Sequence, residues 1–173
     1  VSACALFASN MSKLKKERNE YREMSRIDSM TGLASLQHTL QFGQRLLDMG
    51  KRVRILLIDL NFFKQINDSY GHMIGNKVIM HYADYLRNLV ERKKGLAGRL
   101  GGDEFGIAVL DCDNRGALKR LGEELLRRLD QPIPIAGRPT RLSATIGLSL
   151  APSDASDVDD LIAKADLALY KGK

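Results

Sequence analysis

Residues 52–60, RVRILLIDL, are a nearly continuous apolar run with charge before it and a polar turn after it. An apolar run of this length, without regular polar alternation, is typical of a β-strand that is covered on both faces. Such a strand needs helices on both sides of its sheet. The run therefore predicts an α/β sandwich with residues 52–60 in the middle of the sheet.

Hydrophobic periodicity predicts the elements around this strand. Helical spacing predicts helices over residues 35–49, 75–92 and 115–130, and a last helix that is capped by Ser156 with Asp159 three positions later. Residues 61–74 read as a polar loop, and QPIPIAGRPT, residues 131–140, as a turn region. Residues 99–110 predict a β-hairpin, and alternation over residues 142–150 predicts a half-buried strand. We expect a mainly antiparallel α/β (α+β) sandwich.

The composition fits one globular domain and argues against several functions. The 173 residues are 44% hydrophobic and 28% charged, which is ordinary for a single domain with its own core. The net charge of +6 favours anionic partners, but dispersed basic residues, 6% aromatics and no Trp argue against nucleic-acid binding. Cys4 and Cys112 indicate reduced thiols in the cytoplasm. The apolar start, VSACALFA, is too short to span a bilayer, so we expect no membrane contact.

The hairpin RLGGDEFGIAVL, residues 99–110, carries two adjacent carboxylates beside two glycines. Gly101 and Gly102 predict a two-residue turn with positive φ, in which Leu100 and Asp103 pair directly. Taken alone, Asp103 and Glu104 read as charges that keep an exposed turn soluble. However, strand 53–58 also ends in a carboxylate, Asp59, which would approach Asp103 if the two strands are neighbours. Clustered carboxylates favour a hard divalent cation such as Mg²⁺.

The segment after Asp59, NFFKQINDSYGHMIGN, adds features that suit a phosphate ligand. It supplies Lys64, backbone N–H groups ahead of a helix, and two glycines that allow close approach. It contains no GxxxxGK[ST] motif and is therefore not a P-loop. Taken singly, Lys64 reads as a solvated lysine, Asn67 as a cap and His72 as a packed turn residue.

Five motifs in order resemble one known family. They are DSMTGL (28–33), DLNFFKQINDSYGHMIGN (59–76), RLGGDEF (99–105), SATIG (143–147) and ADLALYKGK (165–173). Together they resemble the GGDEF domain of the diguanylate cyclases, over residues 28–173. The resemblance implies a nucleotidyl-cyclase fold related to polymerase palm domains. It also implies an enzyme that joins two GTP molecules into cyclic di-GMP and releases two pyrophosphates, with one GTP in each of two facing domains.

The resemblance also implies roles for individual residues. Asp59, the backbone carbonyl of Leu60 and Asp103 resemble the ligands of Mg²⁺ or Mn²⁺. Glu104 resembles the acid that assists metal binding and deprotonates the attacking 3′-hydroxyl, and Lys64 completes the catalytic set. The residues that resemble the nucleotide-binding set are the phosphate contacts Phe62, Phe63 (through their backbone), Lys64 and Lys173, and the nucleoside contacts Asn67, His72 and Asn76.

Three positions depart from the family pattern. Asn76 replaces an Asp that accepts two hydrogen bonds from guanine, so we expect weaker GTP binding and a raised KM. Asn61 replaces a second Asp beside the metal site, which we expect to matter little. Arg92 aligns with the product-inhibition motif RxxD, but Gly95 replaces its Asp, so feedback by cyclic di-GMP should be weak or absent.

Residues 1–27 are expected to be the end of an upstream sensor domain and a charged linker helix over residues 11–27. ALFASNMSKLKKE resembles the last strand and exit of a PAS domain, while VSACALFA equally fits the tail of a membrane anchor in a longer parent protein. QPIPIAGRPTRLSATIGLSLAP is similar to GGDEF domains that precede an EAL phosphodiesterase domain. Three functions remain open: an active cyclase, a catalytically weak GTP-binding regulatory module, and a cyclic di-GMP receptor or dimerisation module.

Overall fold

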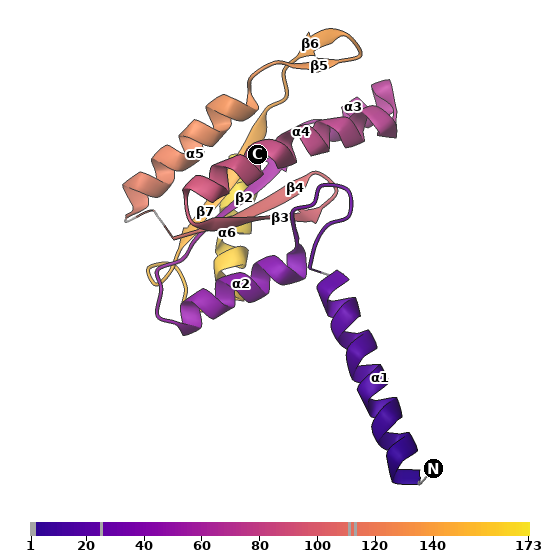
Figure 1. Ribbon diagram of the computed structural model, residues 1–173. Helices are drawn as coiled ribbons and strands as arrows, with labels where there is room; N and C mark the ends of the chain where they lie inside the picture. Colours follow the sequence, from indigo (N-terminus) through magenta and orange to yellow (C-terminus); the bar gives the residue numbers. More distant parts are fainter. Residues whose placement is uncertain (1–2, 25, 111, 113) are drawn as a thin grey trace.

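The computed structural model describes residues 3–173 except residues 25, 111 and 113 (Figure 1). Its main sheet has five strands in the order β1-β3-β4-β2-β7. Only β1 and β3 are parallel, and every other neighbouring pair of this sheet is antiparallel, which confirms the mainly antiparallel sheet. In sheet order, the strands are Ala34–Ser35 (β1), Gly95–Gly101 (β3), Glu104–Val109 (β4), Arg54–Leu60 (β2) and Ala144–Leu150 (β7).

Strand β2 is the buried strand that the sequence predicts. All seven of its residues are buried, and it lies between β4 and β7. Leu56 and Ile58 enter the core under α4 (His72–Arg92) and α5 (Arg115–Leu129). Ile55 and Leu57 enter a second core, under α2 (Leu36–Asp48) and α6 (Val158–Gly172). Figure 1 shows these two helical layers on opposite faces of the sheet, so the predicted α/β sandwich is confirmed.

The segment predicted as a polar loop contains a helix, α3 (Phe63–Tyr70). Only Phe63 and Ile66 of this helix are buried, so its apolar stripe is too short to show as helical periodicity. Gly71, at φ 82°, separates α3 from α4. As a result α4 begins at His72, three positions before the expected start at residue 75.

The hairpin turn lies one residue later than the sequence suggests. Gly101 pairs with Glu104, so the turn residues are Gly102 and Asp103, and the register shifts between Arg99 and Gly101. Neither Gly101 nor Gly102 has a positive φ. The expected pairing of Leu100 with Asp103 is therefore wrong. The irregular register lets the turn close without the left-handed backbone that a primed turn needs.

Two local details near the C-terminal half also differ from expectation. The predicted turn region 131–140 contains a small hairpin of β5 (Ile133–Ile135) and β6 (Arg138–Thr140), whose turn residues Ala136 and Gly137 have φ values of 49° and 77°. These strands are three residues long and contain proline, so they give little strand signal. Helix α6 is capped by Asp157, whose side chain accepts from the N–H of Asp160, and not by Ser156.

Helix α1 (Ala3–Met24) extends away from the sandwich (Figure 1). It confirms a helix over most of residues 11–27, but residues 5–10 are helical too, so the expected PAS-like strand is wrong there. Met11 and Leu14 are both exposed on this helix. Among the described residues, none of the helices contains an apolar stretch that would span a bilayer.

Candidate active site

Three carboxylates meet where strand β2 ends and strand β4 begins. Asp59 is the last but one residue of β2, and the antiparallel register places it opposite Glu104 on β4. The N–H of Leu60 donates to the carbonyl of Asp103 at 3.2 Å, which joins the turn to the end of β2. Asp59 is buried, at 8% exposure. The sequence expectation that Asp59 approaches the hairpin acids is therefore confirmed.

The raised pKa values of Asp103 and Glu104 reflect how close the three acids lie to one another. Burial raises the pKa of Asp103, and the charge of Asp59 adds to this rise, while the backbone N–H of Asp103 and the charge of Lys173 oppose it. Partial desolvation at the hairpin raises the pKa of Glu104, although the residue is exposed, and the charges of neighbouring acids raise it further; these acids are Asp59, Asp103 and Asp166. Like charges at close range disfavour ionisation. This edge of the sheet therefore attracts a proton or a cation.

Lys173 supplies one such cation. Its Nζ atom lies 2.7 Å from Oδ1 of Asp59. The sequence resemblance places Lys173 on the phosphates of a nucleotide, whereas the structure shows it paired with a carboxylate of the site. Asp166 was missed from the sequence. It lies seven residues before Lys173, two turns away on the same side of α6, so helical spacing within the ADLALYKGK motif could have found it.

The backbone at the start of α3 lies close to Asp59 in the chain. Phe62 adopts a left-handed conformation, with φ 59°, and makes no side-chain cap to the helix. Phe62 is 70% exposed, whereas Phe63 is buried and anchors the helix to the core. Lys64 is exposed on the first turn. The uncapped N–H groups at this end of α3 and the Lys64 ammonium are groups that can bind an anion.

The expected nucleoside residues occupy facing parts of α3 and α4. The Oδ1 atom of Asn67 is buried and accepts no hydrogen bond from the described residues. A Cβ on Gly75 would lie 1.8 Å from this atom, so only glycine leaves Asn67 its position. His72 and Asn76 are exposed at the N-terminal end of α4. The structure thus brings Asn67 against the first turns of α4 and leaves a buried acceptor there.

The donor set at the acidic edge consists of oxygen atoms, the ligands that Mg²⁺ prefers. Asp59, Asp103, Glu104 and the Leu60 carbonyl are all near the same strand ends. In the described part of the chain, however, no group of three His, Cys, Asp or Glu side chains is arranged so that it could hold a metal ion. The Asp59–Lys173 ion pair engages one of the expected ligands. The oxygen atoms of these residues are suitable ligands for a divalent cation, but the side chains would have to move to bind one.

A mainly antiparallel sheet between two helical layers carries these acids on a central hairpin, beside a short helix. The sequence profile described as "Diguanylate cyclase, GGDEF domain" matches residues 25–173. The chain belongs to the GGDEF domain family. Its fold is also that of a sensory box/GGDEF family protein from Caulobacter crescentus CB15, with a TM-score of 0.79 and 30% identity over 85% of this chain and 97% of the other.

Curated relatives show the same membership. The signaling protein YkoW of Bacillus subtilis (strain 168) is 31% identical over 95% of this chain and 21% of its own length. The bifunctional diguanylate cyclase/cyclic di-GMP phosphodiesterase MucR of Pseudomonas aeruginosa (strain PAO1) is 36% identical over 71% of this chain and 18% of its own length. The chain spans about a fifth of these relatives. It is homologous to diguanylate cyclases and to multidomain signalling proteins.

Proposed function

We propose that the chain is a diguanylate cyclase that condenses two GTP molecules into cyclic di-GMP and two pyrophosphates. The observation that carries this proposal is the convergence of Asp59, Asp103 and Glu104 at one sheet edge, where burial and mutual repulsion raise the pKa of Asp103 and Glu104. Such an edge is stabilised by a cation. The adjacent start of α3 offers N–H groups and Lys64 to phosphate oxygens.

The residues divide the chemistry between them. Asp59, Asp103, Glu104 and the Leu60 carbonyl would hold Mg²⁺ or Mn²⁺, which supplies positive charge to the triphosphate when bound. In each of two steps a GTP 3′-oxygen bonds to the α-phosphorus of the other GTP, pyrophosphate leaves, and the 3′-hydroxyl loses a proton. Glu104, at the start of strand β4 beside Asp59, would accept that proton. Lys64 and Lys173 neutralise charge on the phosphates.

The nucleoside would lie between α3 and α4. The buried Oδ1 of Asn67 needs a donor, and the N–H groups of a guanine edge supply one. A buried acceptor without a partner costs about 1–3 kcal/mol, so guanine binding would recover this energy. Asn76 and His72 complete the lining, with Asn76 a weaker partner for guanine than Asp. Because each chain holds one GTP, catalysis requires a second GGDEF domain facing the first.

The surrounding protein and its control are part of the same proposal. An upstream sensor domain would act through α1, and an EAL domain would follow residue 173 in a cytoplasmic signalling protein. Product inhibition is weak or absent because Gly95 stands in the RxxD position. A Cβ at Gly95 would lie 2.5 Å from the carbonyl oxygen of Ala108, so this position does not accept the Asp of the motif without a local rearrangement.

One experiment tests the proposal. The purified chain, at increasing protein concentrations, is incubated with GTP and Mg²⁺, and pyrophosphate and cyclic dinucleotide are quantified. We expect turnover that rises more steeply than protein concentration, because two chains must meet, and that Glu104→Gln abolishes. Equal turnover in wild type and Glu104→Gln would contradict the proposal.

The second candidate is a GTP-binding regulatory module with negligible turnover. The Asp59–Lys173 ion pair favours it, because it occupies a carboxylate that the cyclase reaction assigns to the metal. Asn76 favours it too. GTP binding without cyclic dinucleotide at every protein concentration would support this second function. Absence of both binding and turnover would instead favour a dimerisation or receptor role.

A further inference from the structure

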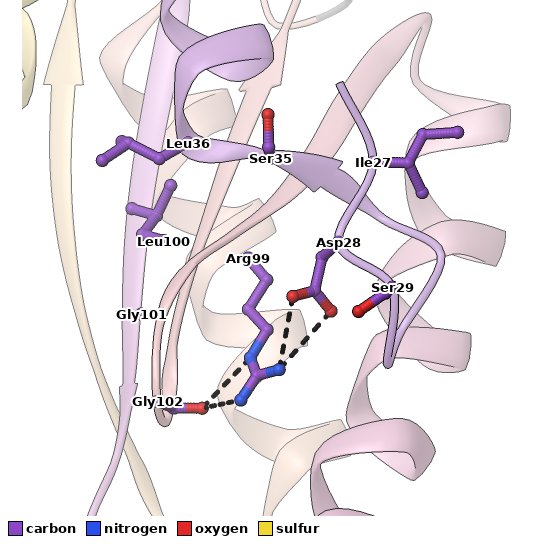
Figure 2. A pocket seen from close by; sticks show the side chains of 9 residues that line it. All are labelled: Ile27, Asp28, Ser29, Ser35, Leu36, Arg99, Leu100, Gly101 and Gly102. Carbon is purple, nitrogen blue, oxygen red and sulfur yellow. Dashed lines mark hydrogen bonds and ion pairs between the residues drawn. The ribbon is translucent and has the colours of Figure 1, made fainter. Parts of the chain in front are cut away.

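Arg99 holds the backbone of the hairpin turn directly before Asp103. Its Nε and Nη2 atoms donate to the carbonyl oxygen of Gly102 at 3.2 and 2.9 Å (Figure 2). Two donors of one planar guanidinium fix both the distance and the direction of the carbonyl. The position of Asp103, the next residue, follows from this contact.

Arg99 is itself held by Asp28. The Nη1 atom of Arg99 lies 3.4 Å from each carboxylate oxygen of Asp28, and both side chains are largely buried, at 16% and 23% exposure. The carboxylate also accepts from the backbone N–H and the hydroxyl of Thr31, at 2.9 and 2.7 Å. The Asp28 side chain is therefore fixed from two directions.

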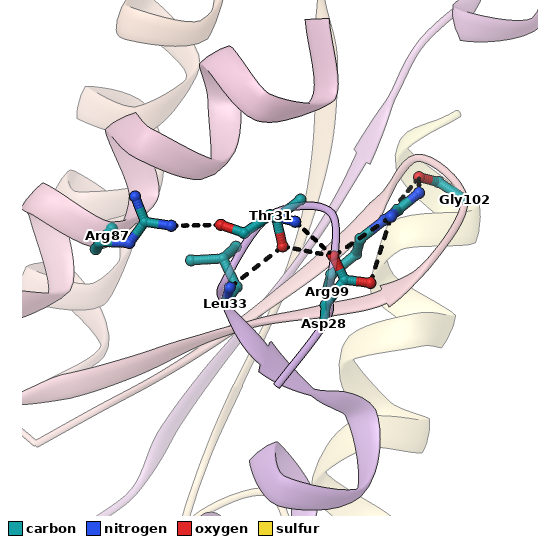
Figure 3. A network of polar contacts seen from close by, with 6 residues as sticks. All are labelled: Asp28, Thr31, Leu33, Arg87, Arg99 and Gly102. Atoms are coloured by element: carbon teal, nitrogen blue, oxygen red, sulfur yellow. Dashed lines mark hydrogen bonds and ion pairs between the residues drawn. The ribbon is translucent and has the colours of Figure 1, made fainter. Parts of the chain in front are cut away.

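A third residue fixes the segment that carries Asp28. The connecting turn, residues 26–35, is closed by backbone hydrogen bonds from Gly32 to Asp28 and from Asp28 to Leu33. Arg87 of helix α4 donates to the carbonyl oxygen of Thr31 in this turn. Figure 3 shows one continuous set of contacts from α4 through the connecting turn to the hairpin. We call these residues, Arg87, Thr31, Asp28 and Arg99 with Gly102, the hairpin clamp.

The hairpin turn has few other contacts to hold it. A Cβ on Gly102 would meet no atom within 4 Å, and the strand register is irregular just before the turn. A cavity of about 480 Å³ lies beside Arg99, lined by Ile27, Leu36 and Leu100 among others (Figure 2). Packing on that side therefore leaves room for the arginine to swing away. The ion pair with Asp28 is what keeps the guanidinium on Gly102.

Repulsion between the acids makes this restraint necessary. Asp59 lies opposite Glu104 on the neighbouring strand, and Asp103 is the next residue of the turn, so like charges meet there and push the turn away from β2. The Leu60 N–H to Asp103 carbonyl bond opposes this movement, and the clamp opposes it from the other side. Loss of the clamp would let the turn relax outward.

We propose that Arg99, held by Asp28 and Arg87, is a positioning residue that sets the location of Asp103 for the cyclase reaction. The effect of Arg99 on catalysis rests on the proposed function, whereas its restraint on the turn does not. Asp28 and Arg87 act through Arg99 and touch no reacting group. A misplaced catalytic group lowers the rate of the chemical step more than it weakens substrate binding.

The test compares Asp28→Asn, Arg99→Lys and Arg87→Gln with a control, Arg115→Gln. The control removes another Arg–Asp ion pair, that of Arg115 with Asp154, away from the hairpin. We expect the three clamp variants to lower kcat by about tenfold or more, with the KM for GTP unchanged. Arg99→Lys keeps the charge but loses the forked donor pair, so it should not rescue the rate. The control should retain wild-type kcat.

A second measurement does not depend on turnover. Hydrogen exchange of the Leu60 amide reports the bond to the Asp103 carbonyl, so the clamp variants should exchange faster there and the control should not. Unchanged exchange in Asp28→Asn and Arg99→Lys would overturn the clamp, whether or not the chain turns over GTP. Faster exchange with unchanged kcat would overturn the positioning role. If wild type has no turnover, the proposed function fails, and exchange alone decides the clamp.

Discussion

Gly75→Ala should weaken nucleotide binding at the proposed nucleoside pocket without lowering the stability of the protein. The added Cβ would lie 1.8 Å from Oδ1 and 3.0 Å from Cγ of Asn67, and 3.2 Å from Cζ of Phe63. No Cβ is tolerated at 1.8 Å, so the Asn67 amide must rotate away. Phe63 is anchored in the core, which leaves Asn67 as the side chain that moves.

The substitution should stabilise helix α4 and weaken GTP binding. Helix α4 gains up to about 1 kcal/mol from replacing Gly by Ala, because alanine has the higher helix propensity. The proposed hydrogen bond from guanine to Asn67 is lost, at about 1–3 kcal/mol. That loss corresponds to an increase in the Kd for GTP of about 5- to 150-fold. We expect weaker GTP binding with little or no loss of melting temperature.

The matched control is Gly122→Ala in α5. There the new Cβ would be 3.6 Å from Leu148, an ordinary contact, so the helix gains the same propensity term without a clash. Calorimetric titration with GTP and thermal unfolding are measured for both variants. A wild-type Kd in Gly75→Ala would refute the placement of guanine against Asn67.

Four further variants test other parts of the proposal. Asn76→Asp restores an acceptor for guanine and should lower the KM for GTP relative to ATP, measured by pyrophosphate release with each nucleotide. Gly95→Asp should lower the melting temperature without creating inhibition by added cyclic di-GMP, because its Cβ meets the Ala108 carbonyl at 2.5 Å; inhibition with retained stability would contradict this expectation. Lys173→Gln removes the ammonium from Asp59 and should tighten Mg²⁺ binding in the absence of nucleotide, which titration calorimetry can detect. Glu104→Gln should raise the melting temperature at neutral pH, because burial and neighbouring acids raise the folded-state pKa of Glu104; the gain should shrink as the pH falls and Glu104 becomes protonated in both states, whereas a gain that persists in acid would exclude charge as its cause.

The core strand and the acids could be predicted because their signals are local. A strand that is buried on both faces must be apolar at successive positions, and β2 shows this in its sequence. Asp59 is recognised as the polar residue that ends this run. Because β2 is buried on both faces, each face of the sheet must be covered, and two helices cover each one.

Contacts between distant segments could not be predicted in this way. Asp28 and Arg99 are 71 positions apart, and no periodicity connects them. The exact turn of the hairpin also escaped prediction, since two adjacent glycines allow more than one register and the structure selects the one that pairs Gly101 with Glu104. Helix α3 was missed because a helix with two buried residues has almost no apolar stripe.

The two cations beside the acidic edge act in different ways. Lys173 contacts Asp59 directly and also lowers the pKa of Asp103, so it reduces the repulsion but competes with any metal ion for the same carboxylate. The charge of Arg99 is balanced by Asp28, and its donors point to a backbone carbonyl, so it restrains the turn without occupying an acid of the site. On the proposed function, a metal ion would replace Lys173 on Asp59 while Arg99 kept its place. Lys173 would then give way to the ligand, and Arg99 would preserve the geometry of the turn that receives it.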